Sequence, residues 1–183
     1  YEPWGSFLSR TYEEKISAIH LLLGIPEDYA TRRKLPIQEE CTDLQAAGKD
    51  IFERELYMDA QALQSWKAMC AAAQDEGIEL QPVSAYRSIE YQQKLFEKKL
   101  SSGQRIEEIL RVNAAPGFSE HHTGRALDLT CPGAECLEES FEHTPAFAWL
   151  MQHAADFSFY LSFPRNNPQG FLYEPWHWCY QGK

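Results

Sequence analysis

The chain has 183 residues, of which 44% are hydrophobic and 13% aromatic, so it can bury the core of one ordinary domain. Its 17 basic and 27 acidic residues give a net charge of -10, which argues against binding nucleic acid or an anionic membrane through bulk charge. An anionic ligand would therefore need a locally placed cation. No apolar run approaches the length of a membrane span, so we expect no transmembrane segment.

The five cysteines are too dispersed for a structural zinc site made of four sulfurs, because no Cys-x-x-Cys pair occurs. Cys131 and Cys136 lie close enough in sequence to close a small disulfide loop in an oxidising compartment. Buried free thiols in a reducing compartment are an equally good interpretation. The cysteine pattern alone leaves the compartment open.

Residues 1–45 are predicted to form a helix and an extended arm that pack on the core, and residues 46–183 to form the main domain. The spacing predicts a helix over 12–23, which Gly24 and Pro26 then end. One face of this helix is apolar: Ile16, Ile19, Leu22 and Leu23. We expect residues 29–38 to be extended.

The next helix is predicted to begin at Asp59, a good N-cap, and to end at Gly77. Its expected buried stripe is Leu63, Trp66, Cys70 and Ala73. Alternating residues then predict a strand over 78–84. Helices over 89–100, capped by Ser88, and over 106–111 follow, before a turn at 114–117.

The segment 125–130 alternates as a strand, which places Leu127 and Leu129 on one face and Asp128 on the other. Thr144 and Pro145 predict a helix start, and the expected buried face of that helix is Phe147, Leu150, Met151 and Ala154. Residues 157–163 alternate as another strand. The last strand is expected to start at Phe171 and to carry Glu174 and His177.

Two separated segments could together form a zinc site. His121, Asp128 and His177 are the candidate ligands, because imidazole and carboxylate are ligand types that zinc accepts. Glu174 would be the base that takes a proton from zinc-bound water. Residues three apart on a regular strand face opposite ways, so Glu174 and His177 require a break, which Pro175 can supply.

Each candidate also has a structural interpretation. A lone histidine is more often a hydrogen-bonded surface or core residue than a ligand, so we set aside His20, His143 and His153. We expect His122 to point away from the metal, because neighbours on an extended segment face opposite ways. Glu174 alone could be a solvated carboxylate, and Arg87 alone a surface ion-pair partner.

Three blocks of sequence resemble the VanY-type D-alanyl-D-alanine carboxypeptidases, within the wider zinc peptidase group that includes lysostaphin-like and hedgehog-like folds. The first block is Ser84-Ala85-Tyr86-Arg87-Ser88 together with Gln92. The second is Ser119-x-His121-x-x-Gly124-x-Ala126-x-Asp128, and the third is Glu174-Pro175-Trp176-His177. The blocks occur in the family's order and cover about residues 50–180. His122 and Arg125 depart from the residues that are frequent at their positions.

The resemblance implies a role for each matching residue. His121, Asp128 and His177 would bind one zinc ion, and Glu174 would be the general base. Arg87 would meet the terminal carboxylate of the substrate or the developing oxyanion, as a fixed cation in an acidic protein. The other expected substrate contacts are Ser119, Gln92, Tyr86 and Trp176.

The resemblance also implies a small α+β domain, in which an antiparallel sheet forms the floor of a zinc cleft and helices pack on one side. The implied function is removal of the C-terminal D-alanine from peptidoglycan stem peptides by Glu-assisted attack of zinc-bound water. The alternatives are L,D-carboxypeptidase or D-Ala-D-Ala dipeptidase action, or a non-catalytic module that binds cell-wall peptide and holds structural zinc. We expect a monomer, and this substrate class favours the cell envelope.

Overall fold

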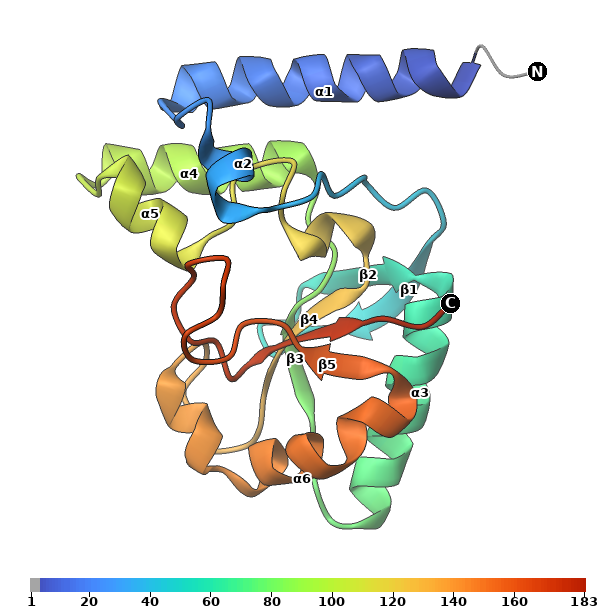
Figure 1. The fold of residues 1–183 in the computed structure, drawn as a ribbon. Coiled ribbons are helices and arrows are strands. Elements are labelled where there is room, and N and C mark those ends of the chain that lie inside the picture. Colours follow the sequence, from blue (N-terminus) through green and yellow to red (C-terminus); the bar gives the residue numbers. More distant parts are fainter. Residues whose placement is uncertain (1–3) are drawn as a thin grey trace.

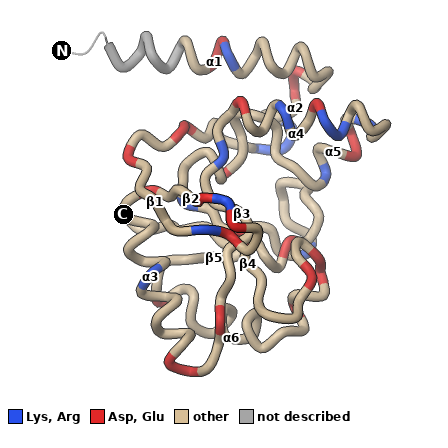
Figure 2. The backbone as a smooth tube through the Cα atoms, turned by 180° about the vertical axis from the view of Figure 1, so that it is seen from behind, with Lys and Arg blue, Asp and Glu red and all other residues tan. Residues whose placement is uncertain are grey.

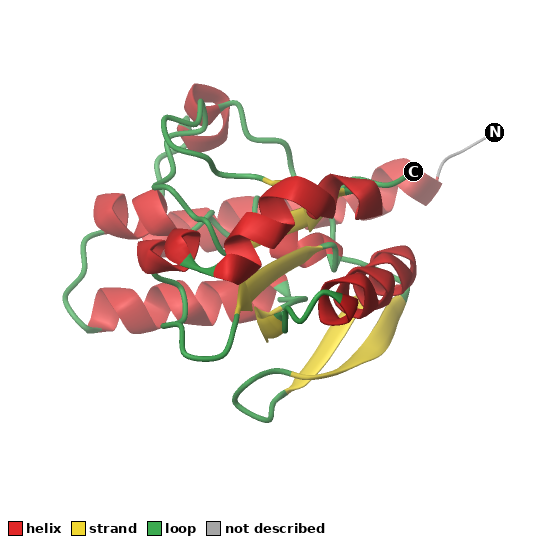
Figure 3. Cartoon of the chain, turned by 90° about the horizontal axis from the view of Figure 1, so that it is seen from below, coloured by secondary structure: helices red, strands yellow, loops and turns green. Residues whose placement is uncertain are grey.

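The computed structural model describes residues 4–183, with side chains from residue 11 onward. Its main sheet has four antiparallel strands in the order β3-β4-β6-β5. These strands are β3 (Gln81–Ser84), β4 (Ala126–Thr130), β5 (Phe159–Leu161) and β6 (His177–Tyr180). A separate hairpin pairs β1 (Leu44–Lys49) with β2 (Glu55–Asp59), and its turn projects from the body of the molecule (Figure 3). The predicted α+β class is confirmed.

The helices form two groups, one on each side of the main sheet in Figure 1. The first group comprises α3 (Ala60–Asp75) and α6 (Pro145–His153). The second comprises α1 (Trp4–Leu23), α2 (Tyr29–Arg33), α4 (Ile89–Ser101) and α5 (Ile106–Val112). Short 3-10 turns also occur: η1 (Glu120–Thr123), η2 (Glu139–His143) and η3 (Ala154–Phe157).

The first core lies between the sheet and the group formed by α3 and α6. Leu127 and Leu129 of β4 and Trp178 of β6 pack there against Trp66 and Leu150. The alternation of β4 places Leu127 and Leu129 on this face, as predicted, and leaves Asp128 on the opposite face. The core therefore anchors the strand that carries a candidate ligand.

Two predicted caps are present in this part of the fold. The carboxylate of Asp59 accepts hydrogen bonds of 3.1 Å from the backbone N–H groups of Gln61 and Ala62 at the start of α3. The hydroxyl of Thr144 accepts a bond of 3.1 Å from Phe147 N–H at the start of α6. Such caps satisfy backbone donors that have no partner inside the helix.

The second core joins the N-terminal helix to α4 and α5. Ile16 and Ile19 of α1 are buried in it together with Phe96 and Ile109. Gly117 has a φ of +92°, and a Cβ at that position would lie 2.6 Å from Ile16 Cδ1. Glycine is required here both by the left-handed backbone and by the close approach of α1.

In α1, α3 and α6, some of the residues that are buried differ from those predicted from the helical spacing. Leu22 is 70% exposed and Met151 57% exposed, whereas Met69 is buried in α3 and Trp149 in α6. Cys70 is only partly buried. Apolar residues outnumber the contact sites on these helices, so packing against the neighbours selects which of them become buried.

Four predicted extended segments are shorter or different in the structure. The last strand, expected from Phe171, begins only at His177, so Glu174 precedes it. Part of the expected arm, 29–38, is the helix α2, which ends at Arg33 and is capped by Lys34 in the left-handed conformation. The strand expected over 78–84 is regular only from Gln81, and the strand expected over 157–163 begins at Phe159 because residues 154–157 form η3. The β1–β2 hairpin was not predicted, since β1 lacks an alternating apolar pattern.

Within the described residues, no helix combines the length and apolar character needed to span a bilayer. All five cysteines lie in this part of the chain and are free thiols, including Cys131 and Cys136. Acidic residues occur on most elements, with basic residues between them (Figure 2).

Candidate metal and active site

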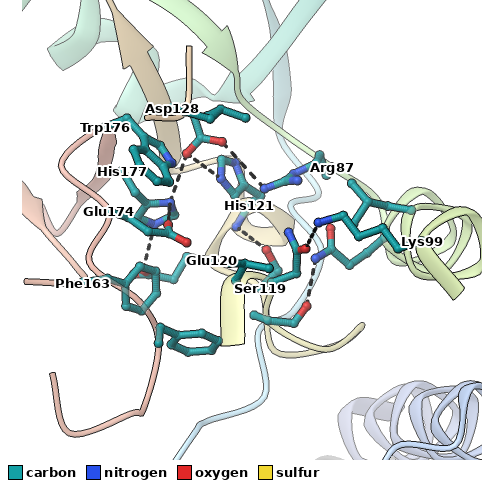
Figure 4. Close-up of a pocket in the computed structure, with 17 residues that line it drawn as sticks. Arg87, Lys99, Ser119, Glu120, His121, Asp128, Phe163, Glu174, Trp176 and His177 are labelled. Carbon is teal, nitrogen blue, oxygen red and sulfur yellow. Dashed lines mark hydrogen bonds and ion pairs between the residues drawn. The ribbon is translucent and has the colours of Figure 1, made fainter. Parts of the chain in front are cut away.

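A cavity of about 390 Å³ separates the main sheet from helix α4. Side chains of β4 and β6 line one wall, and side chains of α4 line the other. In Figure 4 the side chains of His121, Asp128 and His177 point toward one another at this cavity. The cavity lies on the face of the sheet opposite to the first core.

The register of the sheet brings two candidate ligands together. Asp128 of β4 lies directly opposite His177 of β6. Side chains at paired positions emerge on the same face, and Asp128 Oδ1 is 3.2 Å from His177 Nδ1. Both residues are buried, with 5% and 3% of their surfaces exposed.

His121 comes from η1, the turn that precedes β4. Its Nε2 is 3.2 Å from Asp128 Oδ1. Gly124 ends η1 with a φ of +69°, and its carbonyl accepts a 2.9 Å bond from Asp59 N–H. A Cβ on Gly124 would lie 2.7 Å from that nitrogen, so the turn that aims His121 requires glycine.

The three ligand atoms of His121, Asp128 and His177 lie within 4.8 Å of one another. The remaining nitrogen of each histidine already has an oxygen partner: His121 Nδ1 is 2.7 Å from Ala85 O, and His177 Nε2 is 3.1 Å from Glu120 Oε1. Such outer contacts fix the ring orientation and tautomer of metal-binding histidines. The donor set and its surroundings therefore fit a zinc ion.

Charge also favours a cation at this position. Burial would lower the pKa of His177, yet its hydrogen bonds to Asp128 and Glu120 raise that pKa to about 10. Burial likewise opposes ionisation of Glu120, but the hydrogen bond and charge of His177 lower the pKa of Glu120 to about 2. An environment that stabilises a proton on His177 Nδ1 also favours a divalent metal there.

Glu174 reaches the same cavity because the chain turns between it and His177. His177 N–H donates a 3.2 Å bond to Glu174 O, with Pro175 at the second position of the turn. Glu174 Oε2 lies 3.7 Å from His177 Nδ1, so the predicted break at Pro175 is confirmed. Burial raises the pKa of Glu174 to about 7, a value suited to a general base.

Arg87 provides a cation beside the ligand group. Its Nη2 is 3.9 Å from Asp128 Oδ2, and its buried Nε has no hydrogen-bond partner within the described residues. Arg87 N–H donates a 3.1 Å bond to His121 O, which joins the backbone of the first block to that of the second. A guanidinium with a free buried donor can bind an anionic group in the cavity.

The structure brings three of the four other predicted substrate contacts to the cavity: Ser119, Gln92 and Trp176. Gln92 donates a 2.8 Å bond to Ala114 O, and its Oε1 is buried without a partner within the described chain. Tyr86 is not brought there. Its hydroxyl donates a 2.7 Å bond to Glu40, in the segment before the hairpin.

His122 is buried away from the ligand group. Its Nε2 accepts a 3.0 Å bond from Gly117 N–H, and its Nδ1 donates to Arg87 O at 2.7 Å. The orientation of His122 away from the ligand group was predicted from an extended backbone, but residues 120–123 form a 3-10 turn. Both ring nitrogens are used to hold the backbone around Arg87.

Sequence reasoning missed two charged residues that line this cavity. Glu120 lies between two motif residues, Ser119 and His121, and the pattern assigns nothing to its position. Lys99 lies on α4, one of several exposed or half-buried basic residues of that helix, and nothing local separates it from Lys98. Only the packing of the chain identifies which of these side chains faces the cavity.

Comparison with known proteins gives concordant results. The model of the family VanY, D-alanyl-D-alanine carboxypeptidase, matches residues 55–183. The putative carboxypeptidase YodJ of Bacillus subtilis (strain 168) is 35% identical over 173 residues, covering 90% of this chain. The chain spans 61% of the length of that relative.

Solved structures with a similar fold include that of the LdcB LD-carboxypeptidase, which is described as revealing the basis of peptidoglycan recognition. It has a TM-score of 0.71 and 34% identity, and the match covers 80% of this chain and 72% of LdcB. A mutant of the vancomycin resistance D,D-pentapeptidase VanY in complex with Zn(II) has a TM-score of 0.62 and 23% identity, with 81% and 83% covered. At 23% identity, the similarity to this second structure supports the fold alone.

Proposed function

This chain belongs to the VanY family of D-alanyl-D-alanine carboxypeptidases, and we propose that it is a zinc-dependent carboxypeptidase that removes the C-terminal D-alanine of peptidoglycan stem peptides. One observation carries the proposal. Three buried ligand atoms of His121, Asp128 and His177 lie within 4.8 Å of one another, and the Glu174 carboxylate is 3.7 Å from one of them. This is the arrangement of ligands and base that hydrolysis at a metal requires.

His121, Asp128 and His177 would hold one zinc ion, which when bound supplies a Lewis acid for the scissile carbonyl and lowers the pKa of water. In this proposal Glu174 takes a proton from the attacking water and gives it to the leaving amine. Its burial keeps the carboxylate away from bulk solvent, so that it can exchange a proton near neutral pH.

Arg87 is proposed to bind negative charge on the substrate. The free Nε donor and the position beside Asp128 suit either the terminal carboxylate or the developing oxyanion. Gln92 and Ser119 offer polar atoms in the same cavity. A peptide that ends in a free carboxylate therefore finds a cation beside the ligand group, despite the net charge of -10 of the protein.

The similarity to LdcB favours L,D-carboxypeptidase action as a second candidate, since that relative is described as an LD-carboxypeptidase. Incubation with tetrapeptide and pentapeptide stems, followed by mass analysis, separates the candidates. Loss of one alanine from the pentapeptide alone indicates D,D specificity, loss from the tetrapeptide indicates L,D specificity, and release of D-Ala-D-Ala or cleavage of the free dipeptide indicates dipeptidase action.

A non-catalytic module with structural zinc would need neither Glu174 nor Arg87. The decisive test is Glu174→Ala, which should keep about one zinc per chain by elemental analysis and lose release of alanine. The matched control is Glu13→Ala, which changes an exposed carboxylate on α1 and should preserve both properties. Full activity of Glu174→Ala, or no activity of the zinc-loaded wild type on any stem peptide, would reject the proposed enzyme.

A further inference from the structure

Lys99 is a cation in the cavity that the proposed reaction does not use. Gln92, Leu95 and Lys99 follow one another at helical spacing on α4, and all three line the cavity. In Figure 4 the Lys99 side chain extends from α4 toward the other labelled residues. Its neighbour Lys98 is exposed.

Lys99 has no anionic partner within the described part of the chain. Its Nζ donates a hydrogen bond to the neutral side chain of Asn113, and no Asp or Glu oxygen lies within 4.0 Å of it. Leu95 and Phe171 add apolar surface to the same cavity. Burial lowers the pKa of Lys99 and the charge of Arg87 lowers it further, while the charge of Glu174 offsets only part of this decrease. An anion beside Nζ would offset the free-energy cost of burying the charged ammonium group.

Arg87 and Lys99 approach the cavity from different ends of α4. Arg87 precedes the N-cap Ser88, and Lys99 lies in the last turn of the helix. Arg87 Nη2 is 3.9 Å from Asp128 Oδ2, whereas the Lys99 ammonium group is bonded to Asn113, so of these two cations only Arg87 is paired with the ligand group. In the proposed function the anionic group beside the scissile bond meets Arg87, so Lys99 is left for a different anionic group on the substrate.

We propose that Lys99 is a specificity-determining residue that binds a second carboxylate, carried on a side chain of the stem peptide away from the cleaved bond. Asn113 orients the ammonium group through the hydrogen bond on its Oδ1. The inference rests on the proposed function and deepens it. Lys99 would favour stem peptides whose diamino acid has a free side-chain carboxylate over peptides in which that carboxylate is amidated or absent.

The test uses two stem peptides that are identical except for a free or an amidated side-chain carboxylate on the diamino acid. The wild type should show a kcat/KM for the free acid that is roughly 10- to 100-fold higher, mainly through KM, as expected for one charge-assisted hydrogen bond. In Lys99→Met the ratio should fall to near 1. Lys99→Arg should restore part of it, and the control Lys98→Met should keep the wild-type ratio.

Binding of both peptides to zinc-loaded Glu174→Ala, with and without Lys99→Met, provides a readout that does not depend on turnover. The affinity for the free acid should fall with Lys99→Met and that for the amide should change less. Equal losses on both peptides would show that Lys99 meets the terminal carboxylate, and no loss on either would show that it binds no substrate anion. Either result overturns the inference, while a wild type that cleaves neither peptide rejects the proposed function instead.

Discussion

Asp128 and His177 are direct neighbours across the β4–β6 strand pair, with Asp128 Oδ1 3.2 Å from His177 Nδ1. Forty-nine positions separate them in sequence, and the sheet register alone makes them adjacent. A shift of one residue in this pairing would turn one side chain into the first core. The geometry of the ligand group therefore depends on the register of this sheet.

Replacing Asp128 by Asn should abolish tight zinc binding, because the change removes the only anionic member of the ligand triad. Elemental analysis after dialysis should find well below one zinc per chain, with an unchanged far-UV circular dichroism spectrum. His153→Gln, a change in a histidine at the end of α6, is the control and should retain zinc. Full zinc content in Asp128→Asn would show that the metal binds elsewhere.

Glu120 is expected to act as a positioning residue for His177, through the 3.1 Å contact between Glu120 Oε1 and His177 Nε2. Loss of such an outer partner typically weakens metal binding by about 10- to 100-fold. Competition with a chelator should rank the zinc affinities as wild type, then Glu120→Gln, then Glu120→Ala, because glutamine keeps an acceptor and loses the charge. Equal affinities for all three proteins would exclude this role.

His122 is predicted to stabilise the fold without binding the metal. Its ring bonds Gly117 N–H, which is buried, and Arg87 O, which is partly buried, so His122→Ala leaves a donor and an acceptor unpaired. The free energy of unfolding in urea should fall by roughly 2–5 kcal/mol. His122→Gln can keep one of the bonds and should lose less. Both variants should still bind zinc, and loss of zinc from folded His122→Gln would contradict the assignment.

Asp50 should make the stability of the hairpin depend on acidity. Its side chain accepts bonds from Phe52 N–H at 2.7 Å and Arg54 N–H at 3.0 Å, and pairs with Arg54 Nε at 2.6 Å. Burial would raise the pKa of Asp50, but the bonds from Arg54 and Phe52 lower it below its usual range.

Because the folded-state pKa of Asp50 is below the unfolded value of about 3.9, its stabilisation is complete above that pH and is lost as pH falls through the folded-state pKa. Asp50→Asn should reduce the free energy of unfolding by about 1–2 kcal/mol at pH 7 and by less at pH 3. Urea titrations at the two pH values measure this difference. A constant difference would show that the charge of Asp50 contributes nothing.

The amino-acid sequence determined the parts of this protein that local chemistry controls. The caps at Asp59 and Thr144 and the alternation that separates Leu127 from Asp128 follow from side-chain type and spacing. The sequence motifs also predicted the candidate ligands, the break at Pro175 and the base Glu174. Each of these residues lies in a short segment whose pattern of residue types indicates its role.

Only the tertiary structure decided how these segments meet. The pairing of β4 with β6 sets Asp128 against His177, Glu120 becomes the partner of that histidine, and Tyr86 is directed to Glu40 and away from the cavity. Lys99 and Lys98 are equivalent in sequence, and the packing of α4 over the sheet places only Lys99 at the cavity. The reason is physical: strand register and helix packing depend on contacts between distant residues, which no local pattern of residues specifies.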